Sequence, residues 1–212
     1  MYSGIVQGLC EVVAVDDEDG IRRLTVELGP LANGLELGAS VAVNGVCLSA
    51  TATDGGRASF DVIGETQRLT NLGTIAAGDL VDVERSMRHG DEIGGHEVSG
   101  HVSGTAEITE IDVDRGNRTM WFSVDRTWLP YLFHKGFIAI DGASLTISAL
   151  DEERARFAVS LIPDTLARTT LGRREVGERV NIELDARTQA IVRTVERLLA
   201  DERFRDRGIT PA

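Results

Sequence analysis

The strongest constraint on the fold of this chain is a hexapeptide that occurs twice, at residues 44–49 and 141–146. The first copy reads Asn-Gly-Val-Cys-Leu-Ser and the second reads Asp-Gly-Ala-Ser-Leu-Thr, and each follows a short apolar run. Asn-Gly or Asp-Gly between two strand-like runs is the strongest short-range signal for a β-hairpin. A repeat at this period predicts two homologous halves, each containing one such hairpin.

The returning strand of each hairpin carries two small polar side chains. Cys47 and Ser49 lie two residues apart in the first copy, and Ser144 and Thr146 occupy the same places in the second. Side chains two residues apart on a strand point to the same side, so each pair shares one face. Both halves therefore present thiol or hydroxyl groups in one direction.

Further segments repeat in the same order around the hexapeptides. Ser-Gly-Ile-Val at residues 3–6 matches Ser-Gly-His-Val at residues 99–102, and the strand-like run 57–62 matches 156–161. Each half shows about six short strands with turn residues every ~8–12 positions, which is typical of a β-sandwich or a small closed barrel. We favour closure because it removes exposed strand edges.

The repeat divides the chain into an N-terminal barrel (residues 1–96), a C-terminal barrel (97–186) and a terminal segment (187–212). Glycines in the join at residues 89–96 permit a tight crossing. Beyond Asp185 the apolar residues follow helical spacing, at positions 191, 192, 195, 198 and 199. Such a helix either packs on its own subunit or joins copies of the chain, and we favour the second role. The charged tail from residue 201 onward is expected to fray.

Composition limits the possible partners. The formal net charge is −12, from 22 basic and 34 acidic residues, which argues against nucleic acid and anionic membranes and leaves a small molecule as the favoured ligand. No apolar run reaches the length of a spanning helix and the start lacks the pattern of a signal peptide, so we expect a cytoplasmic protein. Cys10 and Cys47 are then expected to be free thiols.

Several motifs together carry a specific resemblance. The chain resembles the α-subunit type of the riboflavin synthase family from residue 1 to about residue 200, through five segments in order: residues 2–6, 44–49, 94–102, 135–146, and 161–165 with 180–183. Each motif alone is weak, but their order within a duplicated frame is specific.

The resemblance implies two six-stranded Greek-key β-barrels and a C-terminal helix through which three chains form a homotrimer. Active sites would lie between the N-terminal barrel of one chain and the C-terminal barrel of its neighbour, with two lumazines per site. The family converts two molecules of 6,7-dimethyl-8-ribityllumazine into riboflavin and 5-amino-6-(D-ribitylamino)uracil without a metal or organic cofactor. The sequence carries no signal for or against association with lumazine synthase.

The resemblance also implies which residues act. The expected catalytic residues are Cys47, His101, Ser144, Thr146 and Asp185. Substrate contacts are expected from the first four of these and from three further groups: Gly4, Ile5, Val6, Ser40, Leu48 and Ser49; Asp61, Val62, Ile63, Gly64, Glu65 and Thr66; and Gly100, Val102, Lys135, Leu145, Ser160, Leu161, Ile162, Pro163, Asp164 and Thr165.

Residue chemistry leaves alternatives open for some of these positions. Cys47 either attacks the substrate or only lines the pocket, because a free cysteine often packs as a small hydrophobe. His101 replaces Ile5 of the first repeat, and histidine exchanges protons near neutral pH, which indicates specialised roles for the two halves. Asp185 is placed to cap the terminal helix, Asp141 to serve its turn, and His96 to be structural.

Four positions depart from residues common in the family: Tyr2 replaces Phe, Ser3 replaces Thr, and Gly64 and Glu97 replace bulkier or apolar residues. We expect Tyr2 and Ser3 to tune the rate at most, and Gly64 and Glu97 to affect the fine shape of the N-terminal pocket and of the crossing. One alternative function is a non-catalytic lumazine- or flavin-binding relative, against which the candidate catalytic residues argue together. A flavin-dependent reductase barrel is disfavoured because no G-x-G-x-x-G follows a strand.

Overall fold

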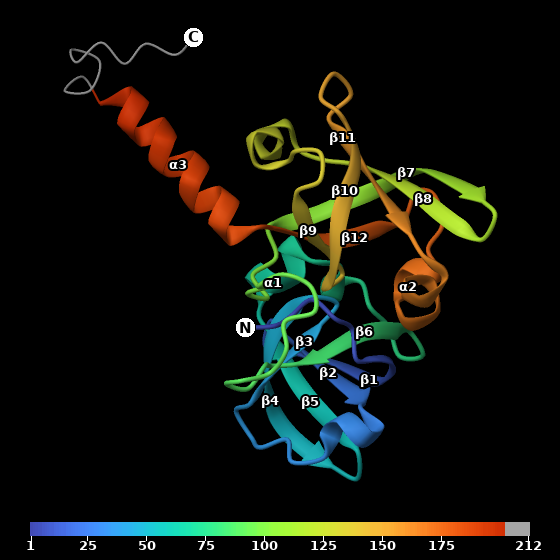
Figure 1. The fold of residues 1–212 in the computed structure, drawn as a ribbon. Coiled ribbons are helices and arrows are strands. Elements are labelled where there is room, and N and C mark those ends of the chain that lie inside the picture. The colour runs from blue at the N-terminus through green and yellow to red at the C-terminus, as the bar shows by residue number, and fades with distance from the viewer. Residues whose placement is uncertain (202–212) are drawn as a thin grey trace.

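The computed structural model describes residues 1–201, which form two closed antiparallel β-barrels and a C-terminal helix (Figure 1). Six strands build the first barrel, in the order β1-β2-β5-β4-β3-β6. Their bounds are β1 Gly8–Glu18, β2 Ile21–Glu27, β3 Ser40–Val43, β4 Val46–Asp54, β5 Arg57–Val62 and β6 Leu80–Arg85.

The second barrel repeats this topology. Its cyclic order is β10-β11-β8-β7-β12-β9, which is the order of the first barrel when β7 to β12 replace β1 to β6. The strands are β7 Gly104–Asp114, β8 Asn117–Ser123, β9 Phe137–Ile140, β10 Ala143–Asp151, β11 Arg156–Leu161 and β12 Arg179–Leu184. Two closed six-stranded barrels, as the sequence predicted, are therefore confirmed.

Short helices connect the strands and are also duplicated. α1 (Gly64–Leu69) follows β5 and α2 (Pro163–Arg168) follows β11, and a single 3-10 turn comes after each helix. These turns are η2 (Asn71–Gly73) and η4 (Thr170–Gly172), while η1 (Gly29–Ala32) and η3 (Arg126–Tyr131) lie between the second and third strands of each half.

Alternating burial along the strands gives each barrel its own core. Phe60 of β5 and Leu24 of β2 are fully buried in the first core, and Phe157 of β11 and Met120 of β8 are fully buried in the second. Burying a large apolar side chain contributes about 1.5–3 kcal/mol, so each half has the apolar content to stabilise a domain.

The two hexapeptide turns meet back to back between the barrels. Asn44 (φ 46°) and Gly45 (φ 75°) form the first turn, and Asp141 (φ 44°) and Gly142 (φ 88°) form the second. Positive φ at both central residues is the conformation that Asn-Gly and Asp-Gly favour. A Cβ atom on Gly45 would lie 2.5 Å from the backbone nitrogen of Gly142, so the contact requires glycine as well as the turn.

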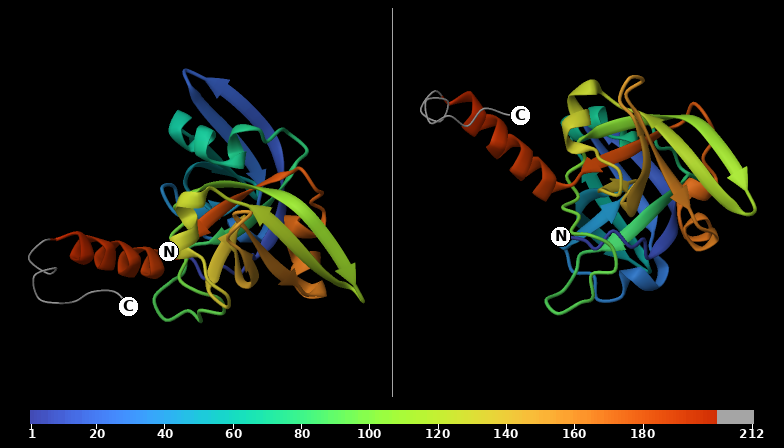
Figure 2. Two further views of the ribbon diagram at one scale, coloured as in Figure 1. Left: turned by 90° about the horizontal axis from the view of Figure 1, so that it is seen from above. Right: turned by 45° about the horizontal axis from the view of Figure 1, so that its top comes forward.

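The C-terminal helix α3 (Ala186–Ala200) projects away from both barrels in every view (Figure 1, Figure 2). Asp185 caps it as predicted, because its carboxylate accepts from the Thr188 backbone nitrogen at 2.7 Å. Ile191 and Val195 on its apolar stripe are 65% and 48% exposed. The predicted terminal segment (187–212) extends beyond the described residues. No helix within residues 1–201 is long and apolar enough to cross a membrane.

Candidate functional site

Two extended segments cross between the barrels, and they organise the candidate site. Residues 2–7 precede β1, residues 98–103 precede β7, and the two segments pair at Tyr2 and Val98. The backbone nitrogen of Tyr2 donates to the Val98 carbonyl at 2.8 Å, and the reverse bond measures 3.0 Å. The segments therefore run in opposite directions past the centre of the molecule.

Each crossing segment reaches the barrel of the other half. The Gly4 carbonyl accepts from the Ser144 backbone nitrogen at 2.7 Å, and the Gly100 carbonyl accepts from the Cys47 backbone nitrogen at 2.9 Å. Val6 packs in the core of the second barrel, as expected for a segment of the first half that reaches the second barrel. We name the N-terminal site by Cys47, Ser49 and residues 100–102, and the C-terminal site by Ser144, Thr146 and residues 4–6.

Buried glutamates hold the crossing segments in place. Glu84 on β6 accepts from the backbone nitrogen and hydroxyl of Ser3 and from the Gly4 nitrogen, at 2.7, 2.7 and 3.0 Å. Glu183 on β12 accepts from Ser99 and Gly100 in the same pattern. Burial raises the pKa of Glu84, and the three donors counteract part of that rise.

The glycines of the Ser-Gly motif permit a close approach to the polar strands. Gly4 and Gly100 have φ of 73° and 84°. A Cβ atom on Gly4 would lie 2.5 Å from the Ser144 Cβ, and one on Gly100 would lie 2.5 Å from the Cys47 Cβ. Both the backbone conformation and the space thus require glycine.

In the N-terminal site the candidate residues surround β4. Cys47 is half-buried and Ser49 is exposed on the same side of the strand, and Ser40 pairs with Ser49 across the β3–β4 ladder. The Cys47 sulfur accepts a hydrogen bond from the buried Tyr2 hydroxyl at 3.1 Å. His101 lies exposed on the crossing segment directly after Gly100.

Other predicted residues of this site lie on its margin or in the core. Asp61 forms an ion pair with Arg23 at 2.7 Å. The segment Ile63–Thr66 starts α1 at the end of β5, beside β4 in the sheet. Leu48 and Val62 face the barrel core, so a ligand would meet only their backbone.

In the C-terminal site the Ser144 side chain contacts a histidine. Ser144 Oγ lies 2.6 Å from His96 Nδ1, and the His96 ring stacks on Phe137 with centroids 5.1 Å apart. Burial lowers the pKa of His96, while the charges of Asp185 and Glu183 oppose this. A neutral ring at neutral pH leaves one nitrogen able to accept a proton.

Asp185 supports this arrangement from the start of α3. Although partial burial acts in the opposite direction, hydrogen bonds from the Thr188 hydroxyl and backbone nitrogen hold the pKa of Asp185 below its usual value. Asp185 is therefore ionised, and its charge favours the protonated form of His96.

The remaining C-terminal residues follow the repeat. Thr146 is exposed two residues beyond Ser144 on the same strand. Lys135 (φ 68°) donates its backbone N–H to the Ile147 carbonyl. Leu161 is buried in the core, and Leu145 is partly buried against it. Residues 162–165 begin α2 at the end of β11.

The two sites differ where their margins correspond. Arg23 and Asp61 pair beside the first, whereas Thr119 and Ser160 stand at the matching places beside the second, with hydroxyls 3.3 Å apart. A cavity of about 330 Å³, partly lined by Thr119 and residues 160–162, lies at the second barrel. The matching cavity near Arg23 measures about 140 Å³. The cavity is therefore larger at the second barrel, where two small hydroxyl side chains stand in place of the ion pair of the first barrel.

A buried polar network lies beneath both sites. Asp141 accepts from the Asn181 backbone nitrogen at 2.8 Å, from Asn71 at 2.9 Å and from Arg174 at 3.0 Å. Its carboxylate is fully buried, and burial raises its pKa. Asp141 does form the turn, but its side chain also links the two barrels through Asn71, which the turn assignment did not anticipate.

Asp82 on β6 is the second buried carboxylate of this network. It accepts from the Thr170 backbone nitrogen at 2.8 Å and from the Thr170 hydroxyl at 2.9 Å. Burial, followed by the nearby charge of Asp141, raises the pKa of Asp82 to about 7. Asn181 holds the equivalent place on β12 and donates to the Asn44 carbonyl at 2.8 Å.

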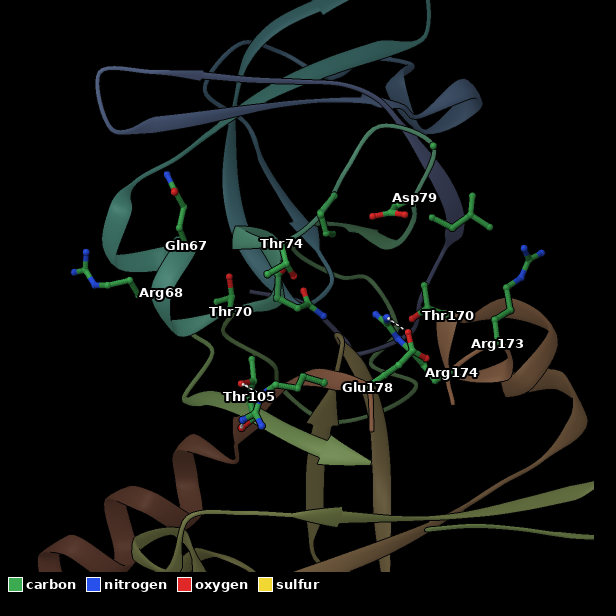
Figure 3. A pocket seen from close by; sticks show the side chains of 15 residues that line it. Gln67, Arg68, Thr70, Thr74, Asp79, Thr105, Thr170, Arg173, Arg174 and Glu178 are labelled. Atoms are coloured by element: carbon green, nitrogen blue, oxygen red, sulfur yellow. Dashed lines mark hydrogen bonds and ion pairs between the residues drawn. The ribbon is translucent and has the colours of Figure 1, made fainter. Parts of the chain in front are cut away.

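A cavity of about 760 Å³ lies between the barrels and is lined by none of the predicted site residues (Figure 3). Arg68 and Arg173 stand at opposite ends of it (Figure 3). The Arg174 side chain forms an ion pair with Asp141 at 3.0 Å. The Thr170 hydroxyl already donates to Asp82. Because its cationic groups do not converge, this cavity is a weaker candidate than the N-terminal and C-terminal sites.

Two contacts were not predicted from the sequence. His96 was assigned a structural role, and Tyr2 was noted only as a departure from the family residue. Both side chains reach the first polar residue of a returning strand, Ser144 and Cys47 respectively. The sequence signals for His96 were its place three residues before the repeated Ser-Gly motif and its position within the family-like segment 94–102.

Comparisons with known proteins agree with the duplicated frame. Residues 3–86 and 99–185 match the family described as the lumazine binding domain. Riboflavin synthase from Escherichia coli (strain K12) is 50% identical to this chain over 202 residues, which cover 94% of each protein. Riboflavin synthase from Chlamydia pneumoniae is 47% identical over 201 residues, covering 94% of this chain and 98% of the relative.

Solved structures share the same architecture. LumP complexed with 6,7-dimethyl-8-(1'-D-ribityl) lumazine aligns with a TM-score of 0.78 at 22% identity, covering 87% of this chain and 99% of that chain. LumP complexed with riboflavin aligns with a TM-score of 0.79 at the same identity and coverage. At this identity the likeness shows the two-barrel fold alone.

Proposed function

The chain belongs to the riboflavin synthase family, and we propose that it catalyses the last step of riboflavin biosynthesis. It is an enzyme of the transferase class, as its curated relatives are. In the proposed reaction one 6,7-dimethyl-8-ribityllumazine gives a four-carbon unit to a second, yielding riboflavin and 5-amino-6-(D-ribitylamino)uracil. The identity of 50% across both repeats favours this enzyme over a non-catalytic binding relative.

The pair of unlike sites on two like barrels is the observation that carries the proposal. Two similar sites suit two molecules of one compound, and holding both in register replaces a bimolecular encounter by a local one. Cys47 opposite Ser144, and His101 opposite Ile5, make the sites chemically unequal. Unequal sites suit a reaction in which one molecule is the donor and the other the acceptor.

The donor requires a nucleophile or water at its electron-poor ring carbon, and the acceptor requires loss of a proton from a ring methyl. Cys47 is suited to the first role as a thiolate, and Ser144 becomes suited to it when His96 accepts its proton. His101 is exposed and follows Gly100, whose carbonyl accepts from the Cys47 backbone nitrogen, so it is suited to proton transfer. Asp185 assists by favouring the imidazolium form of His96.

We further infer that the chain forms a homotrimer in which unlike sites of neighbouring chains meet. The supporting observation is the exposed apolar stripe on α3, a helix that projects from the barrels (Figure 1). Exposed apolar surface at heptad-like spacing favours association. Ile63 and Ile162, at the margins of the two sites, are 56% and 59% exposed and would be covered in the same assembly.

A cytoplasmic location is proposed as well. Both cysteines are free thiols, which agrees with a reducing compartment.

The test is to incubate the purified full-length chain with 6,7-dimethyl-8-ribityllumazine and follow riboflavin by absorbance and the pyrimidine product by chromatography. We expect both products in equal amounts. Tight binding of the lumazine without either product would overturn the proposal and favour the non-catalytic binding relative.

A further inference from the structure

The contact between Tyr2 and Cys47 joins the two chain segments that define the N-terminal site. Tyr2 lies on the first crossing segment, and its hydroxyl is 3.1 Å from the Cys47 sulfur on β4. Its ring lies against Gly100, since a Cβ atom on Gly100 would be 2.9 Å from the ring edge. Gly100 in turn accepts from the Cys47 backbone nitrogen. Tyr2 thus contacts both the side chain and the backbone partner of Cys47.

Packing fixes the position of the Tyr2 ring. Tyr2 is fully buried in a small cluster with Ala42, Val98 and Ala139, between the barrels, and Cys47 packs against this cluster. A ring held on all sides presents its hydroxyl at one place. The hydroxyl therefore fixes the sulfur, whereas the half-buried Cys47 side chain alone retains a choice of rotamers.

Tyr2 remains a hydrogen-bond donor whenever Cys47 ionises. Burial raises the pKa of Tyr2 far above its ordinary value, and the hydrogen bond to Cys47 and the charge of Glu84 raise it further. A phenol that stays protonated donates to a thiolate, and hydrogen bonds to an ionised partner are about twice as strong as neutral ones.

The other half has no equivalent donor. Val98 occupies the place of Tyr2 in the second crossing segment, and it carries no polar atom beyond its backbone. Ser144 instead meets His96, whose ring nitrogen is able to accept its proton. The thiol therefore meets a hydrogen-bond donor, and the hydroxyl meets a potential base.

We propose that Tyr2 is a positioning residue of the N-terminal site, whose hydroxyl orients the Cys47 sulfur and stabilises its thiolate form. In the proposed riboflavin synthase reaction this would hold the thiolate ready for the substrate. That catalytic consequence rests on the proposed function, but the effect on the sulfur does not.

Alkylation of Cys47 by iodoacetamide tests the effect on the sulfur directly. Tyr2→Phe removes only the hydroxyl, and phenylalanine is the residue common at this place in the family. We expect Cys47 alkylation at about pH 7 to slow ~5–10-fold, and the deficit to shrink at about pH 9.5, where more thiol is ionised in both proteins. Glu84, the charged neighbour of Tyr2, is unchanged.

Peptide mapping assigns the signal, because burial raises the pKa of Cys10 to about 11 and keeps that thiol slow. Tyr131→Phe, at the other tyrosine of the chain, is the matched control and should alkylate like the parent. Equal Cys47 rates in Tyr2→Phe and the parent at both pH values would overturn the proposal.

Turnover provides a second readout. Tyr2→Phe should lower kcat ~5–10-fold with KM nearly unchanged, since the hydroxyl touches the sulfur rather than the ligand. If the parent forms no riboflavin, the proposed function fails while the alkylation result still decides the role of Tyr2. Slowed alkylation with unchanged kcat would remove the catalytic consequence and retain the positioning role.

Discussion

The two sites share a frame and differ in chemistry. In both, a buried glutamate holds a Ser-Gly motif, and the glycine carbonyl accepts a hydrogen bond from the backbone nitrogen of the first polar residue of a returning strand. That residue is Cys47 beside a phenol in one site and Ser144 beside an imidazole in the other. Backbone contacts and the glutamates therefore define the frame, while side chains that point outward from it are free to diverge.

The difference teaches how a duplication can serve one reaction with two copies of one substrate. The identical frame explains why both sites would accept the same molecule. The side chains of the two sites explain why the two molecules would have different fates. One site has Cys47 and His101, and the other has Ser144, His96 and Ile5. Changes that make the sites alike, or that separate them, test this comparison.

The largest expected effect comes from separating the unlike sites of neighbouring chains. Removing residues 187–212 deletes the exposed stripe of α3 and should convert the oligomer to monomers, with turnover lowered ~100-fold or more because the two substrates are no longer held together. Sedimentation velocity and a steady-state assay measure both. Glu196→Ala, on the other face of the helix, is the control, and a truncated chain that still sediments as a trimer contradicts the role of α3.

Cys47→Ser makes the N-terminal site resemble the other at its first polar residue. We expect turnover to fall ~100-fold, because a hydroxyl is a much weaker nucleophile than a thiolate. Lumazine affinity should fall by less than turnover, and only at the N-terminal site. Cys10→Ala, in the first core, should retain turnover once its folding is verified by thermal melting. Full activity of Cys47→Ser would remove Cys47 from the mechanism.

His101→Ile installs the residue of the equivalent position 5. Loss of the only exposed imidazole on this crossing segment among the described residues should reduce turnover ~10–100-fold and flatten the pH profile near neutrality. His89→Ala, in the join between the halves, serves as the control. An unchanged pH profile with unchanged kcat would contradict a proton-transfer role.

Asp82→Asn gives the buried network beneath the sites an asparagine on β6 that matches Asn181 on β12. This substitution should leave turnover unchanged. The raised pKa of Asp82, about 7, means that the folded chain retains this proton at pH values where the unfolded chain has lost it. Stability from this group is therefore greatest below about pH 4 and falls as the pH rises to about 7. The asparagine should stabilise the fold by up to about 4 kcal/mol above pH 7.

Urea unfolding at about pH 4.5 and pH 7.5 measures the effect of Asp82→Asn. The geometry favours the substitution, because Asn181 in the equivalent place already accepts from the Asn71 backbone and donates to its side chain. Asp54→Asn, on an exposed hairpin, should change neither value. A loss of stability at both pH values would show that Thr170 requires a carboxylate.

The duplicated barrels could be predicted because their signals are local. Asn44-Gly45 and Asp141-Gly142 dictate tight turns, and alternating apolar residues dictate strands. The helix cap at Asp185 follows from the same kind of local rule. Each of these features depends on residues within a few positions of one another.

The site could be predicted only in part, because its decisive contacts are long-range. Nothing local indicates that Gly4 lies against Ser144, or Gly100 against Cys47. The same holds for the carboxylate of Asp141, whose partners Asn71, Arg174 and Asn181 are all distant from it in sequence. The contact of His96 could not be predicted for the same reason, since its partner Ser144 lies far along the chain, on β10.

Counting bound ligands per chain tests the central claim most directly. Isothermal titration of the full-length protein with a non-reacting lumazine analogue should give two ligands per chain with different affinities, and Cys47→Ser should alter only one of them. A single ligand per chain, or two sites that respond equally to Cys47→Ser, would contradict the account of two unlike sites for one molecule.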